Sequence, residues 1–119
     1  MEPSSLILVV DDDRDIREAL CILLSAEGYR AVSAANGEEA LSYLSSRELP
    51  SLILLDLMMP IMDGWEFRRR QRHDPRLSDI PVVAITAAGN QTEPSIPVDR
   101  ILPKPLELDH VLQALNDYC

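Results

Sequence analysis

The chain alternates between two patterns of hydrophobic and polar residues. Unbroken aliphatic runs occur at Leu6–Val10, Leu52–Leu55 and Val82–Ile85. Such runs are typical of strands in a parallel sheet that helices cover on both faces. Between the runs, apolar residues recur at spacings of three and four, which predicts amphipathic helices. The regular alternation predicts strand–helix–strand units and a parallel sheet between two helical layers.

Local start and stop signals place the remaining elements. A helix is expected over about residues 13–27, because Gly28 follows it as a C-terminal stop. Asn36 is expected to cap a second helix that runs to Leu44, with two glutamates in its first turn, where the helix dipole favours them. Further helices are expected at Trp65–His73 and Leu106–Tyr118, and weaker strands at Tyr29–Ala34 and Ile101–Leu102.

One region departs from the alternation. Residues 87–99 (AAGNQTEPSIPVD) occupy the place of a helix, yet they contain Gly89, Pro94 and Pro97. A proline in a helix interior costs about 3 kcal/mol. We therefore expect a shortened or degenerate fourth helix there.

Composition and charge narrow the class of protein. The 119 residues are 46% hydrophobic, which fits one globular domain over residues 1–119. Twenty acidic residues against eleven basic ones give a net charge of −9, so a nucleic-acid groove lined by positive charge is not expected. Ten of the eleven basic residues are arginine, and Lys104 is the only lysine.

The cysteines and the first residues bear on the cellular compartment. Cys21 and Cys119 have no metal-site spacing, and we expect both to be free thiols in a reducing compartment. Residues 1–5 contain no basic residue, and no apolar run approaches the length of a membrane span. These features predict a cytoplasmic protein without membrane contact.

Polar side chains follow the predicted strands at their carboxyl ends. Asp11 and Asp12 follow the first strong run, Asp56 the second, Thr86 the third, and Lys104 the last short strand. Parallel strands end at the same edge of a sheet, and ligands of open α/β sheets bind at that edge. We therefore expect these side chains to share one pocket.

Such a pocket needs positive charge. Its three carboxylates repel each other, and the single ammonium of Lys104 offsets only one of them. A hard divalent cation would compensate the rest, and Mg²⁺ prefers carboxylate, carbonyl and water oxygens. A bound metal also attracts a phosphoryl group, and a carboxylate can act as nucleophile and become an acyl phosphate. The pattern indicates magnesium-dependent phosphoryl transfer.

Four stretches of the sequence resemble the receiver domains of bacterial two-component response regulators. They are ILVVDDD (Ile7–Asp13), LILLDLMMPIMDG (Leu52–Gly64), VVAITA (Val82–Ala87) and LPKP (Leu102–Pro105). The resemblance covers essentially the whole chain. It implies a (βα)5 flavodoxin-like fold, which is a doubly wound five-stranded parallel sheet of strand order 2-1-3-4-5.

The resemblance also implies a role for each residue of the pocket. Asp56 is the expected phosphoacceptor, Thr86 the hydroxyl that contacts the phosphoryl group, and Lys104 its charge partner. The implied magnesium ligands are Asp11, Asp12, Asp56 and the backbone carbonyl of Met58. The implied donor is a sensor histidine kinase or a phosphotransfer protein, and an unknown downstream protein reads the phosphorylated state. Such a domain catalyses only its own phosphorylation and a slow dephosphorylation.

Two departures from the family pattern concern output rather than chemistry. Ile101 stands three positions before Lys104, where the family usually has an aromatic residue that reorients on phosphorylation. The stretch from Thr86 to Lys104 is also about one helical turn shorter than is usual. Both changes lie on the face that reads out phosphorylation or forms homodimers in this family. They motivate an alternative interpretation, a receiver-fold interaction module that signals without phosphorylation.

The remaining predictions concern single positions near the pocket and one helix. Met58 and Ala88 are apolar where polar side chains could orient an attacking water, which predicts slow loss of the phosphoryl group. Asp56 is followed by Leu57 and Met58 rather than by a second acid two residues on, which disfavours an aspartyl phosphatase. The arginines of the third helix are expected to form a solvated face that pairs with nearby acids, with a partner contact as the alternative. These are Arg68, Arg69, Arg70 and Arg72.

Overall fold

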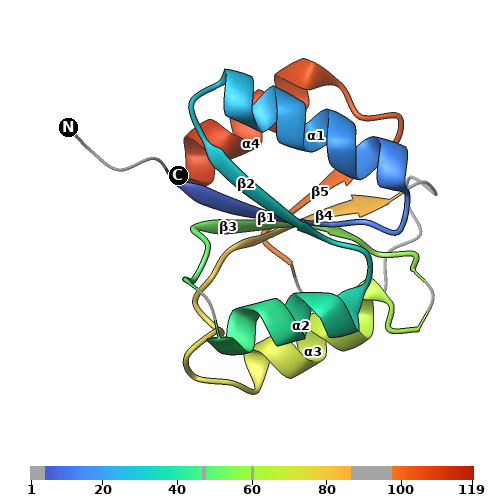
Figure 1. The fold of residues 1–119 in the computed structure, drawn as a ribbon, viewed down its shortest axis with the longest axis vertical. Coiled ribbons are helices and arrows are strands. Elements are labelled where there is room, and N and C mark those ends of the chain that lie inside the picture. Colours follow the sequence, from blue (N-terminus) through green and yellow to red (C-terminus); the bar gives the residue numbers. More distant parts are fainter. Residues whose placement is uncertain (1–4, 47, 60, 87–97) are drawn as a thin grey trace.

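The strands and helices lie where the alternation predicts them. The computed structural model describes residues 5–46, 48–59, 61–86 and 98–119 (Figure 1). Its strands are β1 (Leu6–Val10), β2 (Arg30–Ala34), β3 (Leu52–Asp56), β4 (Val82–Thr86) and β5 (Arg100–Pro103). Its helices are α1 (Arg14–Ala26), α2 (Gly37–Ser46), α3 (Gly64–Arg72) and α4 (Leu108–Tyr118). Each of these confirms a predicted element, with bounds that differ by at most two residues.

The five strands form one parallel sheet in the order β2-β1-β3-β4-β5. Helices α1 and α4 cover one face, and α2 and α3 cover the other (Figure 1). The predicted flavodoxin-like order is therefore confirmed. Because the strand order reverses between β1 and β3, the crevice in which such sheets bind their ligands lies beyond the carboxyl ends of these two strands.

Each central strand contributes to two hydrophobic cores. Leu8 and Val10 of β1 belong to the core under α2 and α3, whereas Ile7 and Val9 belong to the core under α1 and α4. All four side chains are fully buried. The run of β1 is aliphatic at every position because both of its faces are covered. The two cores fix β1 and β3 in place, so the residues just beyond them have little freedom to move.

Capping groups set the ends of the helices. The side-chain oxygens of Asp13, Asn36 and Asp63 accept hydrogen bonds from backbone N–H groups two or three residues on, at the starts of α1, α2 and α3. The predicted cap at Asn36 is thus confirmed. Gly28, just beyond α1, has a φ of 93°, a left-handed conformation that glycine adopts without strain.

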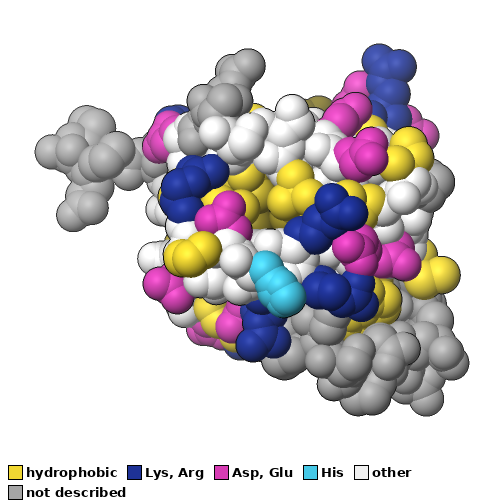
Figure 2. Space-filling view, turned by 90° about the horizontal axis from the view of Figure 1, so that it is seen from below, with side chains coloured by type: hydrophobic (Ala, Val, Ile, Leu, Met, Phe, Trp, Pro, Cys, Tyr) yellow, Lys and Arg dark blue, Asp and Glu magenta, His cyan; other side chains and the backbone are white. Residues whose placement is uncertain are grey.

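The arginines of α3 divide between solvent and interior. Arg69 and Arg70 are exposed and form ion pairs with Glu66, as predicted for a solvated face. Figure 2 shows basic and acidic side chains next to one another on the side of the molecule that α2 and α3 cover. The prediction is wrong for Arg68, whose residue surface is only 7% exposed. Its guanidinium donates to Gln71 at 2.8 Å and lies 3.8 Å from the carboxylate of Asp99. Arg68 is therefore buried beside Asp99, a residue distant from it in the sequence.

The other predictions concern the fourth helix, the two cysteines and membrane spans. The shortened fourth helix was expected within residues 87–99, of which 87–97 lie outside the described residues. Ala88 lies outside them too. Cys21 is half-buried and Cys119 is exposed, and both are free thiols. Among the described residues, no helix has the length and apolar character needed to cross a membrane.

Candidate functional site

The residues that follow the strands meet at the carboxyl edge of the sheet. Asp56 is the last residue of β3 and pairs in register with Ile85 of β4. Thr86 ends β4, where it is buried, and its carbonyl accepts a hydrogen bond from the backbone N–H of Lys104 at 2.8 Å. Asp11 extends β1 by one residue, because its N–H donates to Ala34 of β2 at 3.1 Å. The pocket that the strand-end rule predicts is therefore formed.

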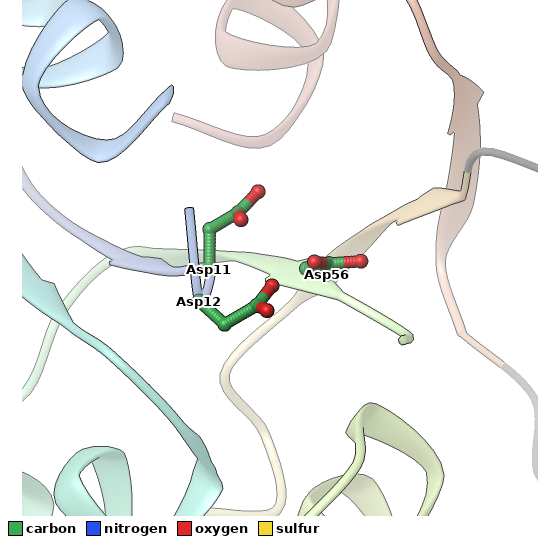
Figure 3. Close-up of side chains that lie close together, drawn as sticks. All are labelled: Asp11, Asp12 and Asp56. Carbon is green, nitrogen blue, oxygen red and sulfur yellow. The ribbon is translucent and has the colours of Figure 1, made fainter. Parts of the chain in front are cut away.

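Three carboxylates converge in this pocket. One oxygen atom from each of Asp11, Asp12 and Asp56 lies within 4.8 Å of the others. Figure 3 shows Asp11 and Asp12 reaching from the end of β1 toward the end of β3. Asp11 and Asp56 are 0% and 2% exposed, whereas Asp12 is exposed to solvent. The cluster is thus buried at its base and open on one side.

Lys104 is the cation of the pocket. Its Nζ lies 3.5 Å from Oδ2 of Asp56 and 3.6 Å from Oδ2 of Asp11. One ammonium beside three carboxylates leaves two negative charges without a partner in this cluster. The lysine that stood out in the composition therefore lies beside a cluster of three carboxylates.

This excess of negative charge changes the acidity of Asp56. The pKa of its carboxyl is raised from 3.8 to about 6, mainly by burial and also by the neighbouring charge of Asp11. The backbone N–H of Met58, which donates to Oδ1 of Asp56 at 3.0 Å, lowers the pKa, and so does Lys104. Burial outweighs these two contacts. In the absence of another cation, the pocket holds a proton unusually well.

The donor set fits a hard divalent cation. Among the described residues, the only buried side-chain polar atom without a hydrogen-bond partner is Oδ2 of Asp11, which faces the cluster. Such an atom costs free energy unless a charge or donor satisfies it. The three side chains offer only oxygen ligands, which suit Mg²⁺, and the exposed side near Asp12 leaves access for water. The residues present therefore match the chemistry of a magnesium site.

Comparison with known proteins identifies the family. The response regulator receiver domain matches residues 7–116 of the chain. The chain belongs to this family. Among solved structures, a response regulator receiver protein from Pseudomonas putida superposes with a TM-score of 0.87 and 29% sequence identity, covering 98% of this chain and 99% of that one. The chemotaxis response regulator CheY4 of Vibrio cholerae gives a TM-score of 0.86 at 27% identity, covering 98% and 99%.

Curated relatives include both short and long proteins. An uncharacterized 14.6 kDa protein from Leptolyngbya boryana is 38% identical over 117 residues, which cover 95% of this chain and 88% of that protein. Response regulator MprA of Mycolicibacterium vanbaalenii is 40% identical over 114 residues, 92% of this chain and 48% of MprA. A probable transcriptional regulator, ycf27 of Porphyridium aerugineum, is 45% identical over 87 residues, 73% of this chain and 35% of that protein. The receiver therefore spans about a third to a half of the longer relatives.

Glycine at position 64 of this receiver has a role that the sequence alone did not assign. Its N–H donates to the carbonyl of Leu57 at 3.1 Å, which folds the loop after β3 back onto the strand end. A Cβ at position 64 would lie 2.7 Å from both the backbone oxygen of Asp56 and the Cα of Leu57. Real Cβ atoms do not approach backbone so closely. Only glycine therefore lets α3 begin directly against the residue that carries the central carboxylate.

The methionines of this loop differ in their surroundings. Met58 is 67% exposed immediately beyond Asp56, whereas Met59 and Met62 are buried and belong to the core under α2 and α3. The loop thus anchors itself with two methionines and leaves the third on the rim of the acidic pocket.

Proposed function

We propose that this receiver is a phosphorylation-dependent signalling switch that accepts a phosphoryl group on Asp56. The observation that carries the proposal is the pocket itself, in which a buried carboxylate lies between two further acids and a lysine. A carboxylate whose pKa is raised by burial, at the switch point of an open α/β sheet, is a candidate for chemistry rather than for stability.

The proposed step is a direct transfer. A carboxylate oxygen of Asp56 attacks the phosphorus of a phosphohistidine on the donor protein. The P–N bond breaks, its electron pair leaves with the imidazole, and an aspartyl phosphate remains. Lys104, already 3.5 Å from the carboxylate, offsets the negative charge of the incoming group, and the hydroxyl of Thr86 donates to one of its oxygens. When bound, Mg²⁺ supplies the positive charge that lets an anion approach three carboxylates.

We assign the ligands of that ion to the same cluster. Asp11, Asp12 and Asp56 provide the carboxylate oxygens, and the backbone carbonyl of Met58 provides a fourth protein ligand. The charge of the aspartyl phosphate then shifts the receiver between two conformations, and a downstream protein reads the change.

Intact mass spectrometry tests the chemistry. The protein is incubated with acetyl phosphate and Mg²⁺, and a gain of one phosphoryl group is expected. Asp56→Asn should show no gain, and excess EDTA should prevent it in the wild-type chain. Asp79→Asn is the matched control, since Asp79 is an exposed acid away from the pocket and should be labelled normally. Labelling that persists in Asp56→Asn would contradict the assignment.

The surface beside Lys104 supports a protein donor. An apolar groove of about 380 Å³ lies between α1 and the start of α4, and Ile16, Leu20, Lys104 and Leu108 are among its lining residues. We propose that the histidine kinase or phosphotransfer protein docks there. Leu108→Asp should leave labelling by acetyl phosphate unchanged and slow labelling by a phosphorylated histidine phosphotransfer domain. The control Ile22→Asp changes an apolar residue that is 71% exposed and outside the groove.

A second candidate function rests on Ile101. This residue is half-buried in β5 and packs against the core under α2 and α3, where it offers an aliphatic rather than an aromatic side chain. A receiver-fold interaction module that signals without phosphorylation would keep the fold and lose the response. Beryllofluoride, a phosphate mimic, separates the two functions by NMR. Shifted amide signals over residues 98–101 favour the switch, and unchanged signals favour the module.

Size-exclusion chromatography addresses the partners of the phosphorylated state. The same samples, with and without acetyl phosphate, are compared by elution volume. Earlier elution after labelling would favour a homodimer, and an unchanged volume would favour a switch that acts on another protein as a monomer.

A further inference from the structure

Arg17 of α1 contacts the acidic pocket through the backbone rather than through a carboxylate. Its Nη1 donates to the backbone oxygen of Asp11 at 2.8 Å, and the arginine is half-buried. Among the described residues it forms no ion pair with an acid. An arginine that binds the backbone carbonyl of an acidic residue, and no carboxylate, can act on the geometry of that backbone.

The contact completes a set of hydrogen bonds that fixes Asp11 at three atoms. Its N–H donates to Ala34 at 3.1 Å, its Oδ1 accepts from the N–H of Asp13 at 2.9 Å, and its backbone oxygen accepts from Arg17. The remaining atom, Oδ2, is buried, lacks a hydrogen bond within the described residues, and lies 3.6 Å from Nζ of Lys104. The three contacts therefore leave one oxygen of Asp11 to face the pocket.

The same carbonyl belongs to the peptide that joins Asp11 to Asp12. Holding its oxygen fixes the plane of that peptide, and with it the direction in which the second carboxylate leaves the chain. Asp12 is exposed, so the core does not hold its side chain as it holds Asp11. The orientation of the Asp11 and Asp12 side chains therefore depends on the peptide whose oxygen accepts the hydrogen bond from Arg17.

We infer that Arg17 is a positioning residue for the magnesium site, which presents the acid pair to the ion through the Asp11 carbonyl. This inference rests on the proposed function, because it presupposes that the pocket binds Mg²⁺. Charge and positioning act in opposite directions here. A nearby guanidinium repels a cation, so its removal would tighten Mg²⁺ binding if charge were its only effect. If Arg17 positions the ligands, its removal weakens binding, as is usual for groups that orient metal ligands.

Isothermal calorimetry, in which Mg²⁺ is titrated into the unphosphorylated protein, distinguishes the charge effect of Arg17 from its positioning effect. Arg17→Ala should raise the Kd about tenfold, at the low end of the 10–100-fold effect of such groups. Arg14→Ala is the matched control: it removes the same charge from the first turn of α1, where the side chain is 79% exposed and pairs with Glu18. Its Kd should be unchanged or slightly lower. Arg17→Lys keeps a donor on a long stem and should give an intermediate Kd.

Each outcome bears on one conclusion. Equal or tighter binding in Arg17→Ala than in Arg14→Ala would overturn the positioning role. If Arg17→Ala does not give a folded circular dichroism spectrum, Arg17→Met replaces it, because methionine keeps a long stem and removes the donor; a Kd equal to that of Arg14→Ala would then overturn the role. Failure of the wild-type chain to bind Mg²⁺ would instead overturn the magnesium site, and the role of Arg17 with it.

Discussion

Replacing Asp56 by asparagine should stabilise the metal-free receiver at neutral pH. The side chain is 2% exposed, and burial, together with the charge of Asp11, raises the pKa of its carboxyl from 3.8 to about 6. Above pH 6 the folded protein therefore holds a buried charge that the unfolded chain would expose to water. Asparagine has nearly the same shape and can accept the hydrogen bond from Met58, but it carries no charge.

The pKa shift sets the size and the sign of the effect. A change of about two units corresponds to about 3 kcal/mol, since each unit is worth 1.36 kcal/mol. Because the folded-state pKa is the higher one, the proton on Asp56 favours folding below pH 3.8, and this contribution disappears as the pH rises through 6. The asparagine variant should therefore match the wild-type chain near pH 4 and exceed its stability by about 3 kcal/mol above pH 7.

Urea unfolding in EDTA, repeated between pH 4 and pH 8, measures the difference directly. Asp79→Asn removes an exposed acid and should change stability by less than about 0.5 kcal/mol at every pH. Adding Mg²⁺ should narrow the gap, because an ion bound only by the folded wild-type pocket stabilises it. A gap that is absent at pH 7.5, or equally large at pH 4, would refute the assignment of the cost to the Asp56 charge.

Three other substitutions test the loop that follows β3. Gly64→Ala should cost about 1–3 kcal/mol in urea unfolding, because the new methyl group meets backbone atoms 2.7 Å away, whereas Gly37→Ala meets only the flexible side chain of a methionine and should cost much less. Ile61 has a φ of 71° and is 74% exposed, so Ile61→Gly should stabilise by about 1 kcal/mol; the control Ile22→Gly, within α1, should destabilise by a similar amount. Met58→Asn places a polar amide beside the aspartyl phosphate and should shorten its lifetime, measured by loss of the added mass over time; an unchanged lifetime would count against a role for this position in slow dephosphorylation.

The pocket was predictable because its position depends on the pattern of aliphatic runs and on the parallel order of the strands. Each strong aliphatic run ends one residue before a polar side chain, and parallel strands bring those ends together whatever the helices do between them. Asp11, Asp56 and Lys104 are therefore placed by the strands alone. What could not be predicted depends on contacts between distant residues. The burial of Arg68 requires the carboxylate of Asp99, which lies 31 positions away and arrives only with β5.

The roles of Gly64 and Arg17 could not be predicted either, because they too depend on contacts between different elements of the fold. The sequence marks Gly64 as part of a turn, but the reason that only glycine fits is the approach of backbone from the end of β3. Arg17 reads as one polar residue on the outer face of an amphipathic helix. Its contact with the Asp11 carbonyl depends on how α1 is docked on the sheet, which no local pattern encodes.

Side-chain contacts hold both ends of β5. Oδ2 of Asp99 accepts from the N–H of Val82 at 2.7 Å and faces Arg68, and the Asp99 carbonyl accepts from the hydroxyl of Tyr118 at 3.0 Å. The opposite end of the strand leads to Lys104, whose side chain is held by ion pairs with the pocket. We expect a charge added to Asp56 to act first on the carboxyl end of β5, because Lys104 contacts that carboxylate directly.

Stability and function make opposite demands on the acidic pocket, and this opposition is itself an argument for function. The buried charge of Asp56 costs free energy, and within the described residues Oδ2 of Asp11 is buried without a hydrogen bond. Groups that lower stability are typical of functional sites, because activity can require what stability alone disfavours. The single lysine offsets only part of the cost. The excess of negative charge is what a cation and a phosphoryl group together would use, so the free-energy cost of these charges follows from the chemistry that we propose for the pocket.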